Sequence, residues 1–303
     1  MRTAFLFPGQ GSQSPNFLHV LPDHAAVRGV FDEATRVLGS DPRHLDSEAA
    51  LQSTVAVQTG ILVAGVAYTQ LLAAEGARPD AVAGLSSGAF AAAVASGSLA
   101  FADALQLIRL RSEAMAHAFG EGYGMLAILG LREAAVRTLV ERVASPAMPL
   151  YVSSINAPDE IILAGSDGAL SAAHEAAERA GARARRLGVS VPSHGSLLDG
   201  VSAQLREAIQ EVQLKQPDIP YISNHRARAA HSQKDIAEDL IVNVSRTVHW
   251  YESTRLLYEL GCRVFIEVPP GRALTNLLKR EFPDVRALPA TDVDLQSILH
   301  VMR

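Results

Sequence analysis

Residues 81–95 read AVAGLSSGAFAAAVA, and this stretch decides how the chain folds. Residues 81–83 are a short apolar run fit for a buried strand, and residues 89–95 strongly favour a helix. Between them, Gly84, Ser86 and Gly88 fit the pattern G-x-S-x-G, in which glycines tolerate a sharp, strained turn beside a serine. The stretch predicts a strand–turn–helix unit that exposes Ser86 as a nucleophile. Close packing of small residues without chemistry is the alternative.

Strands and helices alternate along the chain around this turn. Residues 3–7 read as a buried strand that runs into the turn PGQGSQ at 8–13. Residues 54–75 and 101–118 have helical length, and residues 264–268 form a late strand. This alternation predicts a parallel sheet covered by helices.

The segment from residue 124 to residue 187 has a different rhythm, because its order is β-α-β-β-α-β. That is the ferredoxin-like order, so we expect a small subdomain at 124–187 inserted into a core formed by 1–123 and 188–303. The expected strands are 125–129, 150–155, 160–164 and 183–187, and the expected helices are 133–143 and 169–180.

Composition excludes several classes of protein. The 303 residues are 48% hydrophobic, enough for a sizeable core, and 27 basic against 32 acidic residues give a net charge of −5. No broad positive field is expected to attract nucleic acid or a membrane. The single cysteine, Cys262, excludes an internal disulfide and a multi-cysteine zinc site, and no metal site is expected. We expect a cytoplasmic protein without a signal peptide or a membrane span.

A serine nucleophile needs a base, and His194 is the favoured candidate among ten histidines. It follows an expected β-branched strand at 189–191 and the stiff turn Pro192-Ser193, where parallel-sheet proteins display functional side chains. A buried structural histidine is the alternative.

The tetrahedral oxyanion of acyl transfer needs backbone donors. One should be the N–H of Ser87, and the turn Gly9-Gln10-Gly11 can supply a second. Arg111 follows in the next helix, where a surface charge is the commoner role.

Taken together, these motifs resemble the malonyl-CoA:acyl-carrier-protein transacylase family over essentially the full chain. The matching stretches are FLFPGQGSQ, GLSSG, Arg111, SINAPDEIILAG at 154–165, SVPSH at 190–194, and RTVHW followed by FIEVPPG. The resemblance implies an α/β-hydrolase-like parallel-sheet core with an inserted ferredoxin-like subdomain.

The resemblance also implies roles. Ser86 would be acylated, His194 would be its base and acid, and Gln10 with Ser87 would supply the oxyanion N–H groups. Arg111 would bind the free carboxylate of a malonyl group. Two further implied site residues are Asn156, facing the site from the small subdomain, and His249, whose backbone carbonyl would orient His194 in place of a triad acid.

Malonyl-CoA would be the substrate, and the thiol of a phosphopantetheine-type group on an acyl carrier protein would be the acceptor, with no bound cofactor.

Three departures from the family's usual motifs narrow the assignment within the family. First, the usual GHSxGE elbow has become GLSSGA, which brings in Leu85 and Ala89. Second, His249 replaces a glutamine that is usual at its position. Third, EVGPG has become EVPPG. A GLS-x-GA elbow looks more like the epsilon subunit of bacterial malonate decarboxylase, which loads malonyl onto that complex's own carrier subunit.

Three other functions remain open from the sequence. The same chemistry could serve fatty-acid or polyketide synthesis, which the choice of carrier protein would reveal. An acyl-thioester hydrolase would release the acyl group without a thiol. A non-catalytic scaffold subunit would keep the fold but not the activity. The intact Ser86, His194 and Arg111 argue against that function.

Overall fold

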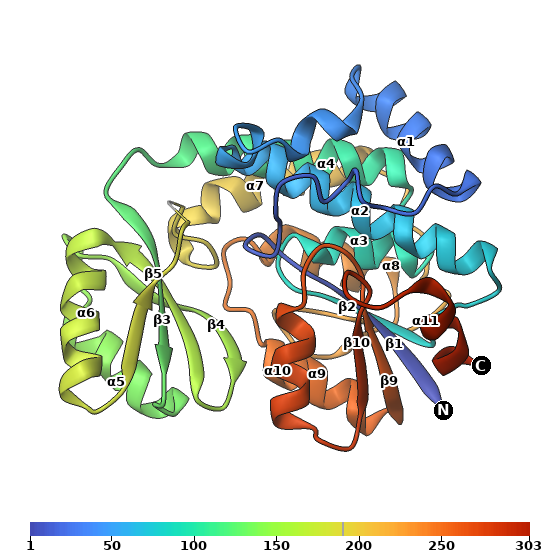
Figure 1. The fold of residues 1–303 in the computed structure, drawn as a ribbon. Helices are drawn as coiled ribbons and strands as arrows, with labels where there is room; N and C mark the ends of the chain where they lie inside the picture. The colour runs from blue at the N-terminus through green and yellow to red at the C-terminus, as the bar shows by residue number, and fades with distance from the viewer. Residues whose placement is uncertain (190) are drawn as a thin grey trace.

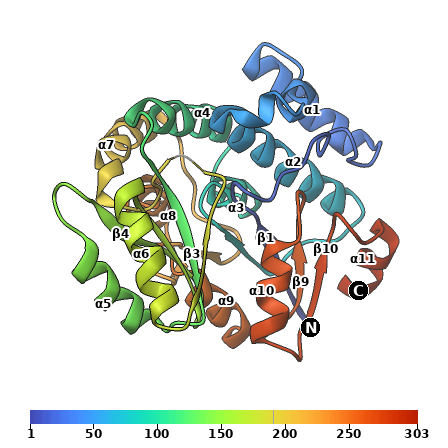
Figure 2. The ribbon, with the colours of Figure 1, turned by 60° about the vertical axis from the view of Figure 1, so that its left-hand side comes forward.

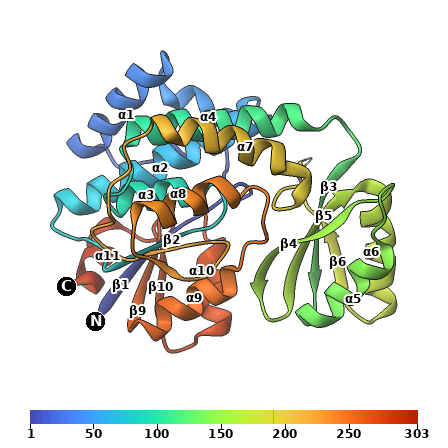
Figure 3. The same ribbon diagram turned by 180° about the vertical axis from the view of Figure 1, so that it is seen from behind.

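The computed structural model describes residues 1–189 and 191–303; Ser190, in the SVPSH stretch, lies outside the described residues. Its strands form two separate sheets, and Figure 1 shows the smaller sheet set to one side of the larger one. From behind, both chain termini lie at the end of the molecule away from the small sheet (Figure 3).

The larger sheet has the strand order β10-β9-β1-β2-β7-β8. All neighbouring pairs are parallel except β7 and β8, which form an antiparallel hairpin. Its strands are β1 (Arg2–Phe7), β2 (Ala81–Gly84), β7 (Tyr221–Ile222), β8 (Ala229–Ala230), β9 (Cys262–Glu267) and β10 (Arg286–Pro289).

Helices cover both faces of this sheet, because its central strands bury side chains on each side. In β1, Phe5 and Phe7 join the core cluster under α2, α3 and α4, whereas Ala4 and Leu6 pack in the cluster under α9 and α10. Figure 2 shows these two helix layers on opposite sides of the strands. The helices of this part are α1 (Ala25–Leu38), α2 (Thr54–Ala74), α3 (Gly88–Ala95), α4 (Phe101–Ala118), α7 (Asp199–Ala208), α8 (Gln233–Val242), α9 (Trp250–Glu259), α10 (Ala273–Glu281) and α11 (Leu295–Met302).

The smaller sheet is antiparallel, with the order β4-β5-β3-β6. Its elements follow one another as β3 (Tyr123–Leu129), α5 (Glu133–Val143), β4 (Leu150–Ala157), β5 (Glu160–Ser166), α6 (Asp167–Arg179) and β6 (Arg183–Arg186). Sequence order and strand order are those of a ferredoxin-like unit. The predicted fold class, a parallel-sheet α/β core with a ferredoxin-like insertion, is therefore confirmed.

Helix α2 is long and apolar enough to cross a membrane by length and composition alone. Within the fold it is a core helix, because 89% of its most apolar window is buried inside the protein. Gln58 is one of its few polar residues, and it is 2% exposed.

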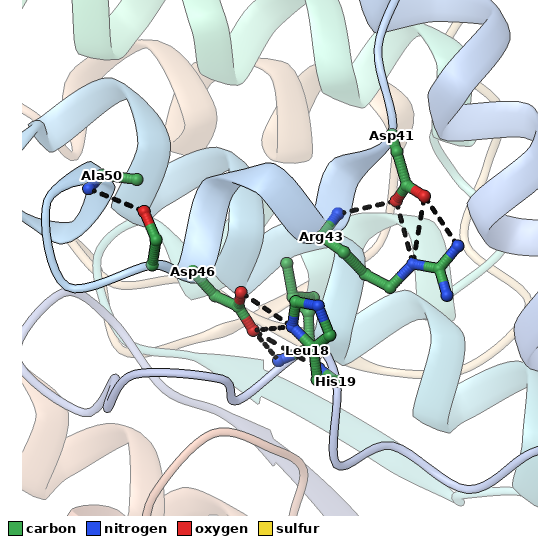
Figure 4. Close-up of polar contacts among 7 residues, drawn as sticks. Leu18, His19, Asp41, Arg43, Asp46 and Ala50 are labelled. Carbon is green, nitrogen blue, oxygen red and sulfur yellow. Dashed lines mark hydrogen bonds and ion pairs between the residues drawn. The ribbon is translucent and has the colours of Figure 1, made fainter.

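The loop after β1 carries Gln10 and is fixed at its far end by a buried carboxylate. Asp46 accepts hydrogen bonds from the backbone N–H of Leu18 at 2.7 Å and of His19 at 3.3 Å, and it contacts His19 Nδ1 at 3.0 Å (Figure 4). Figure 4 also shows the nearby Asp41–Arg43 pair. These contacts anchor the loop beside α2, so Gln10 is held from both ends of its loop.

One expectation about local structure is wrong. No strand includes the described residues near 189–191; instead the N–H of Ser193 bonds to the carbonyl of Val191 at 2.9 Å, closing a tight turn. His194 then has φ +65°, and its N–H donates to the carbonyl of Val244 at 2.8 Å. Proline at 192 has no N–H to give to a ladder, which favours this turn over a strand. The two short strands β7 and β8 are not among the strands expected from the sequence.

Candidate active site

The turn at Ser86 has the geometry of a nucleophile elbow. Ser86 has φ +54°, in the left-handed region that L residues rarely adopt, between the end of β2 and the start of α3. A Cβ added at Gly84 would lie 2.1 Å from the carbonyl oxygen of Gly88, and one at Gly88 would lie 2.2 Å from that of Phe7. Only glycine fits at both positions, so the flanking glycines of the motif serve the turn itself.

Ser86 lies next to His194. The Nε2 atom of His194 is 2.8 Å from Ser86 Oγ, and its Nδ1 atom contacts the backbone carbonyl of Asn243. Because a carbonyl can only accept, Nδ1 carries the proton and Nε2 faces the hydroxyl as an acceptor. This is the tautomer that a general base requires.

Burial keeps His194 neutral. The residue is 5% exposed, and desolvation followed by the positive charge of Arg111 lowers its pKa from 6.5 to about 3. The hydrogen bond to Asn243 acts in the opposite direction but is the smaller effect. At neutral pH the imidazole is therefore ready to accept the proton of Ser86.

Asn243, rather than His249, orients His194. Asn243 caps the C-terminus of α8, which leaves its carbonyl free to point at the ring. His249 caps the N-terminus of α9, and its carbonyl accepts from the N–H of Ser253 at 3.0 Å and from its hydroxyl at 2.9 Å. The expected His249 contact is therefore wrong, because the first turn of α9 already uses that carbonyl.

Arg111 is a buried cation beside the nucleophile. It is 0% exposed, and its Nη2 atom donates to Ser86 Oγ at 3.2 Å. Its Nη1 atom donates to Gln58 Oε1, and Nη2 also reaches Asn243 Oδ1 at 3.5 Å. Within residues 1–189 and 191–303 no carboxylate lies within ion-pairing distance of it, and its Nε atom is buried without a partner. Desolvation lowers its pKa to about 9, so it stays charged at neutral pH.

Gln10 joins the same network from the opposite side. Its Oε1 atom accepts from Gln58 Nε2 at 3.3 Å, and its Nε2 atom donates to Thr54 Oγ1 at 3.4 Å. In the described part of the chain, no hydrogen bond uses the backbone N–H of Gln10 or of Ser87. Both donors are therefore available, and their use by an oxyanion stays a prediction.

A cavity of about 240 Å³ opens in front of Ser86, between the two sheets. Its volume suits a short acyl group better than a long chain. Asn156 lines it from β4, with its amide held by Ser154 Oγ at 2.6 Å and Glu160 Oε1 at 3.3 Å. The other lining residues include Gln10, Gln58, Leu85, Met115, Met125, Ile162, Arg185 and His194.

The departure GLSSGA places its two changed residues in and behind the nucleophile elbow. Leu85 is half-buried and makes the wall beside Ser86 apolar, and Ala89 is fully buried in α3. The sequence reasoning missed Gln58 and Asn243. A glutamine in the middle of an apolar helix is a signal that could have found Gln58, because a buried amide needs partners.

The stretch FIEVPPG is structural in this fold. Glu267 ends β9 at 0% exposure, and its carboxylate accepts from the N–H of Leu274 at 3.1 Å and of Thr275 at 2.6 Å. An acidic group at a helix N-terminus satisfies N–H groups that have no partner within the helix. This contact fixes α10 against the end of the sheet.

Comparison with known proteins places these features in a family. Residues 4–299 match the family model described as "Acyl transferase domain". The malonyl CoA-acyl carrier protein transacylase of Bacillus subtilis (strain 168) is 33% identical over 96% of this chain and 94% of its own length. That of Escherichia coli (strain K12) is 33% identical over 91% and 92%.

Solved structures of malonyltransferases have the same fold as this chain. The crystal structure of the acyl-carrier-protein S-malonyltransferase from Burkholderia pseudomallei 1710b has a TM-score of 0.92 and 36% identity, covering 100% of this chain and 99% of that one. A malonyl-transacylase solved in complex with its type II PKS acyl-carrier protein has a TM-score of 0.93 at 31% identity, with 100% and 99% covered.

Proposed function

On the premise that the chain belongs to the malonyl-CoA:acyl-carrier-protein transacylase family, we propose that it moves a malonyl group from malonyl-CoA to the thiol of an acyl carrier protein through an ester on Ser86. The observation that best supports this proposal is the environment of Arg111. This cation is fully buried, lies within hydrogen-bonding distance of Ser86 Oγ and has no acidic partner among the described residues. A buried charge is costly unless paired, and a malonyl carboxylate would pair it.

The steps follow from the site residues. His194 Nε2 removes the proton of Ser86 Oγ as the hydroxyl attacks the thioester carbonyl, and the N–H groups of Gln10 and Ser87 bind the oxyanion. His194 then returns the proton to the departing CoA thiolate. In the second half the carrier thiol attacks the ester, and the proton moves through His194 to Ser86. CoA and the carrier's phosphopantetheine thiol thus enter as substrates, and no cofactor takes part.

The acyl-enzyme can be tested directly. Incubation with malonyl-CoA and no acceptor should add one malonyl group to the intact mass, and peptide mapping should place it on Ser86. Ser86→Ala should remain unlabelled, with Ser87→Ala as the matched control that keeps its label. Label on another residue, or no label on the native protein, would contradict the mechanism.

We further propose that the carrier is the carrier subunit of malonate decarboxylase. The support is the elbow GLSSGA, with Leu85 against the cavity and Ala89 in the core. The competing role, in fatty-acid or polyketide synthesis, is favoured by the names of the relatives, one of which was solved with a polyketide carrier protein. Cytoplasmic location stays a prediction.

Carrier choice decides between these roles. Initial rates of malonyl transfer should be compared for the carrier proteins of malonate decarboxylase, of fatty-acid synthesis and of polyketide synthesis. All three are used at equal concentration, each with its phosphopantetheine-type thiol group attached. Faster transfer to the malonate decarboxylase carrier is expected, and preference for a fatty-acid or polyketide carrier would refute the narrower assignment. Free malonate appearing at the same rate without any thiol would instead identify a hydrolase.

A further inference from the structure

Asn224, just beyond the end of β7, holds the nucleophile elbow through its side-chain amide. Its Oδ1 atom accepts from the backbone N–H of Ser86 at 2.9 Å, and its Nδ2 atom donates to the carbonyl of Gly84 at 2.8 Å. Asn224 is 3% exposed, so water does not compete for these contacts.

The two contacts continue the ladder between β2 and β7. The strands are parallel, and the N–H of Val82 bonds to the carbonyl of Pro220. Since ladder contacts repeat every two residues, a continued ladder would bring the N–H of Ser86 to the carbonyl of residue 224. There the chain leaves the strand at φ +54°, and the side-chain amide of Asn224 takes the place of a backbone peptide group.

Because the side chain of Asn224 makes the ladder contacts, its backbone groups are free for other contacts. Its carbonyl accepts from the N–H of His249 at 2.9 Å, at the start of α9. The next residue is fixed by α8, because the buried carboxylate of Asp239 accepts from the N–H of His225 at 3.1 Å and from Tyr221 Oη at 2.7 Å. Two helices therefore fix the residue that contacts the elbow.

We propose that Asn224 is a positioning residue for the reaction at Ser86. The strained backbone of Ser86 would relax without a partner for its N–H, and Ser86 Oγ would move from its 2.8 Å contact with His194 Nε2. A displacement of about 1 Å at a reacting group costs about 10²-fold in rate. Asn224 thus sets the rate of Ser86 acylation without touching the substrate.

The inference rests on the proposed function, and a burst experiment tests it. Native protein and Asn224→Ala are mixed with malonyl-CoA without acceptor, and the malonyl-enzyme is followed by intact mass. A positioning role predicts an acylation rate about 10²-fold lower with the same final amplitude, because every folded molecule still acylates. A merely structural role predicts the native rate with a reduced amplitude, and that result would overturn the proposal.

Two further variants sharpen the result. Ser223→Ala is the matched control, because it lies on the same hairpin and its buried hydroxyl has no partner among the described residues; its rate should equal the native rate. If Asn224→Ala does not fold, Asn224→Leu fills nearly the same volume but offers no acceptor for the N–H of Ser86 and no donor for the carbonyl of Gly84, and the same slow rate with full amplitude is expected.

Failure of the proposed function is separately visible. If the native protein forms no malonyl ester, that function is wrong, and labelling of Ser86 by a small sulfonyl fluoride then tests Asn224 without any acyl-CoA. Slower labelling of Asn224→Ala than of Ser223→Ala supports the positioning role. Equal labelling rates would refute it.

Discussion

Replacing Arg111 by methionine should show whether this residue binds the malonyl carboxylate or only stabilises the fold. Burial lowers the pKa of Arg111 from 12.5 to about 9, which corresponds to roughly 5 kcal/mol of unfavourable burial at about 1.4 kcal/mol per pKa unit. Because the guanidinium donor is charged, its contacts with Gln58, Ser86 and Asn243 each return about 1.5–3 kcal/mol. Arg111→Met removes the buried charge together with these contacts and fills much of the space, so the two effects largely offset and the free energy of unfolding should change little.

Malonyl transfer should change far more than stability. Loss of one partner of a buried charge pair costs about 2–5 kcal/mol, so malonyl transfer should fall roughly 30- to several-thousand-fold. Acetyl transfer should hold or increase, because an acetyl group has no carboxylate and no longer meets an unpaired guanidinium. The ratio of the two activities is therefore the quantity that reports the role of Arg111.

The assay measures kcat/KM for acylation of Ser86 by malonyl-CoA and by acetyl-CoA, together with a thermal unfolding curve. Arg109→Met is the matched control, since Arg109 lies on the same helix but is only half-buried and is paired with Glu113. An unaltered malonyl-to-acetyl ratio in Arg111→Met would refute the reasoning. A parallel loss of both activities and of stability would make Arg111 a brace for α4.

Three other outcomes are expected. His194→Ala should slow acylation by about 10²–10⁴-fold, the usual contribution of a general base, and a native rate would move that role to another residue. Because the pKa of His194 is lowered to about 3 and only the neutral ring accepts a proton, the acid limb of kcat/KM should lie below about pH 5; a limb near pH 6.5 would contradict this. Arg185 lines the cavity from exposed β6, so Arg185→Glu should raise the KM for the carrier, most strongly at low salt. Arg179→Glu on α6 makes the same charge change as a control, and equal KM values would count against a docking role.

The small subdomain could be predicted nearly residue by residue, whereas parts of the core could not. Helix α5 has the expected bounds, and β3 begins only two residues earlier than expected. The reason is that β3 and β5 are short, continuous apolar runs and the helices of this unit are amphipathic. Strands β7 and β8 have two residues each. Strand β7 forms because it pairs with β2, and β8 forms because it pairs with β7, so local propensity carries no signal for either.

The site shows the same division. Ser86 and His194 could be predicted because the type of side chain carries the chemistry, whereas the role of Arg111 followed only from the family resemblance. The structure brings all three together. The carbonyl that orients His194 could not be located, because every residue has a carbonyl and only the end of α8 selects that of Asn243. A backbone acceptor leaves no mark in the sequence.

Burial ties the two charged groups of the site into one mechanism. In the free protein, the positive charge of Arg111 is the second cause of the lowered pKa of His194, after desolvation. A malonyl carboxylate paired with Arg111 would cancel that charge, so the pKa of His194 should rise when the correct substrate binds. The ring is then a better proton acceptor when Ser86 attacks, and a better-stabilised acid when the thiolate leaves. An acetyl group brings no such charge. Arg111 should therefore favour malonyl both by binding it and by making His194 more basic in its presence.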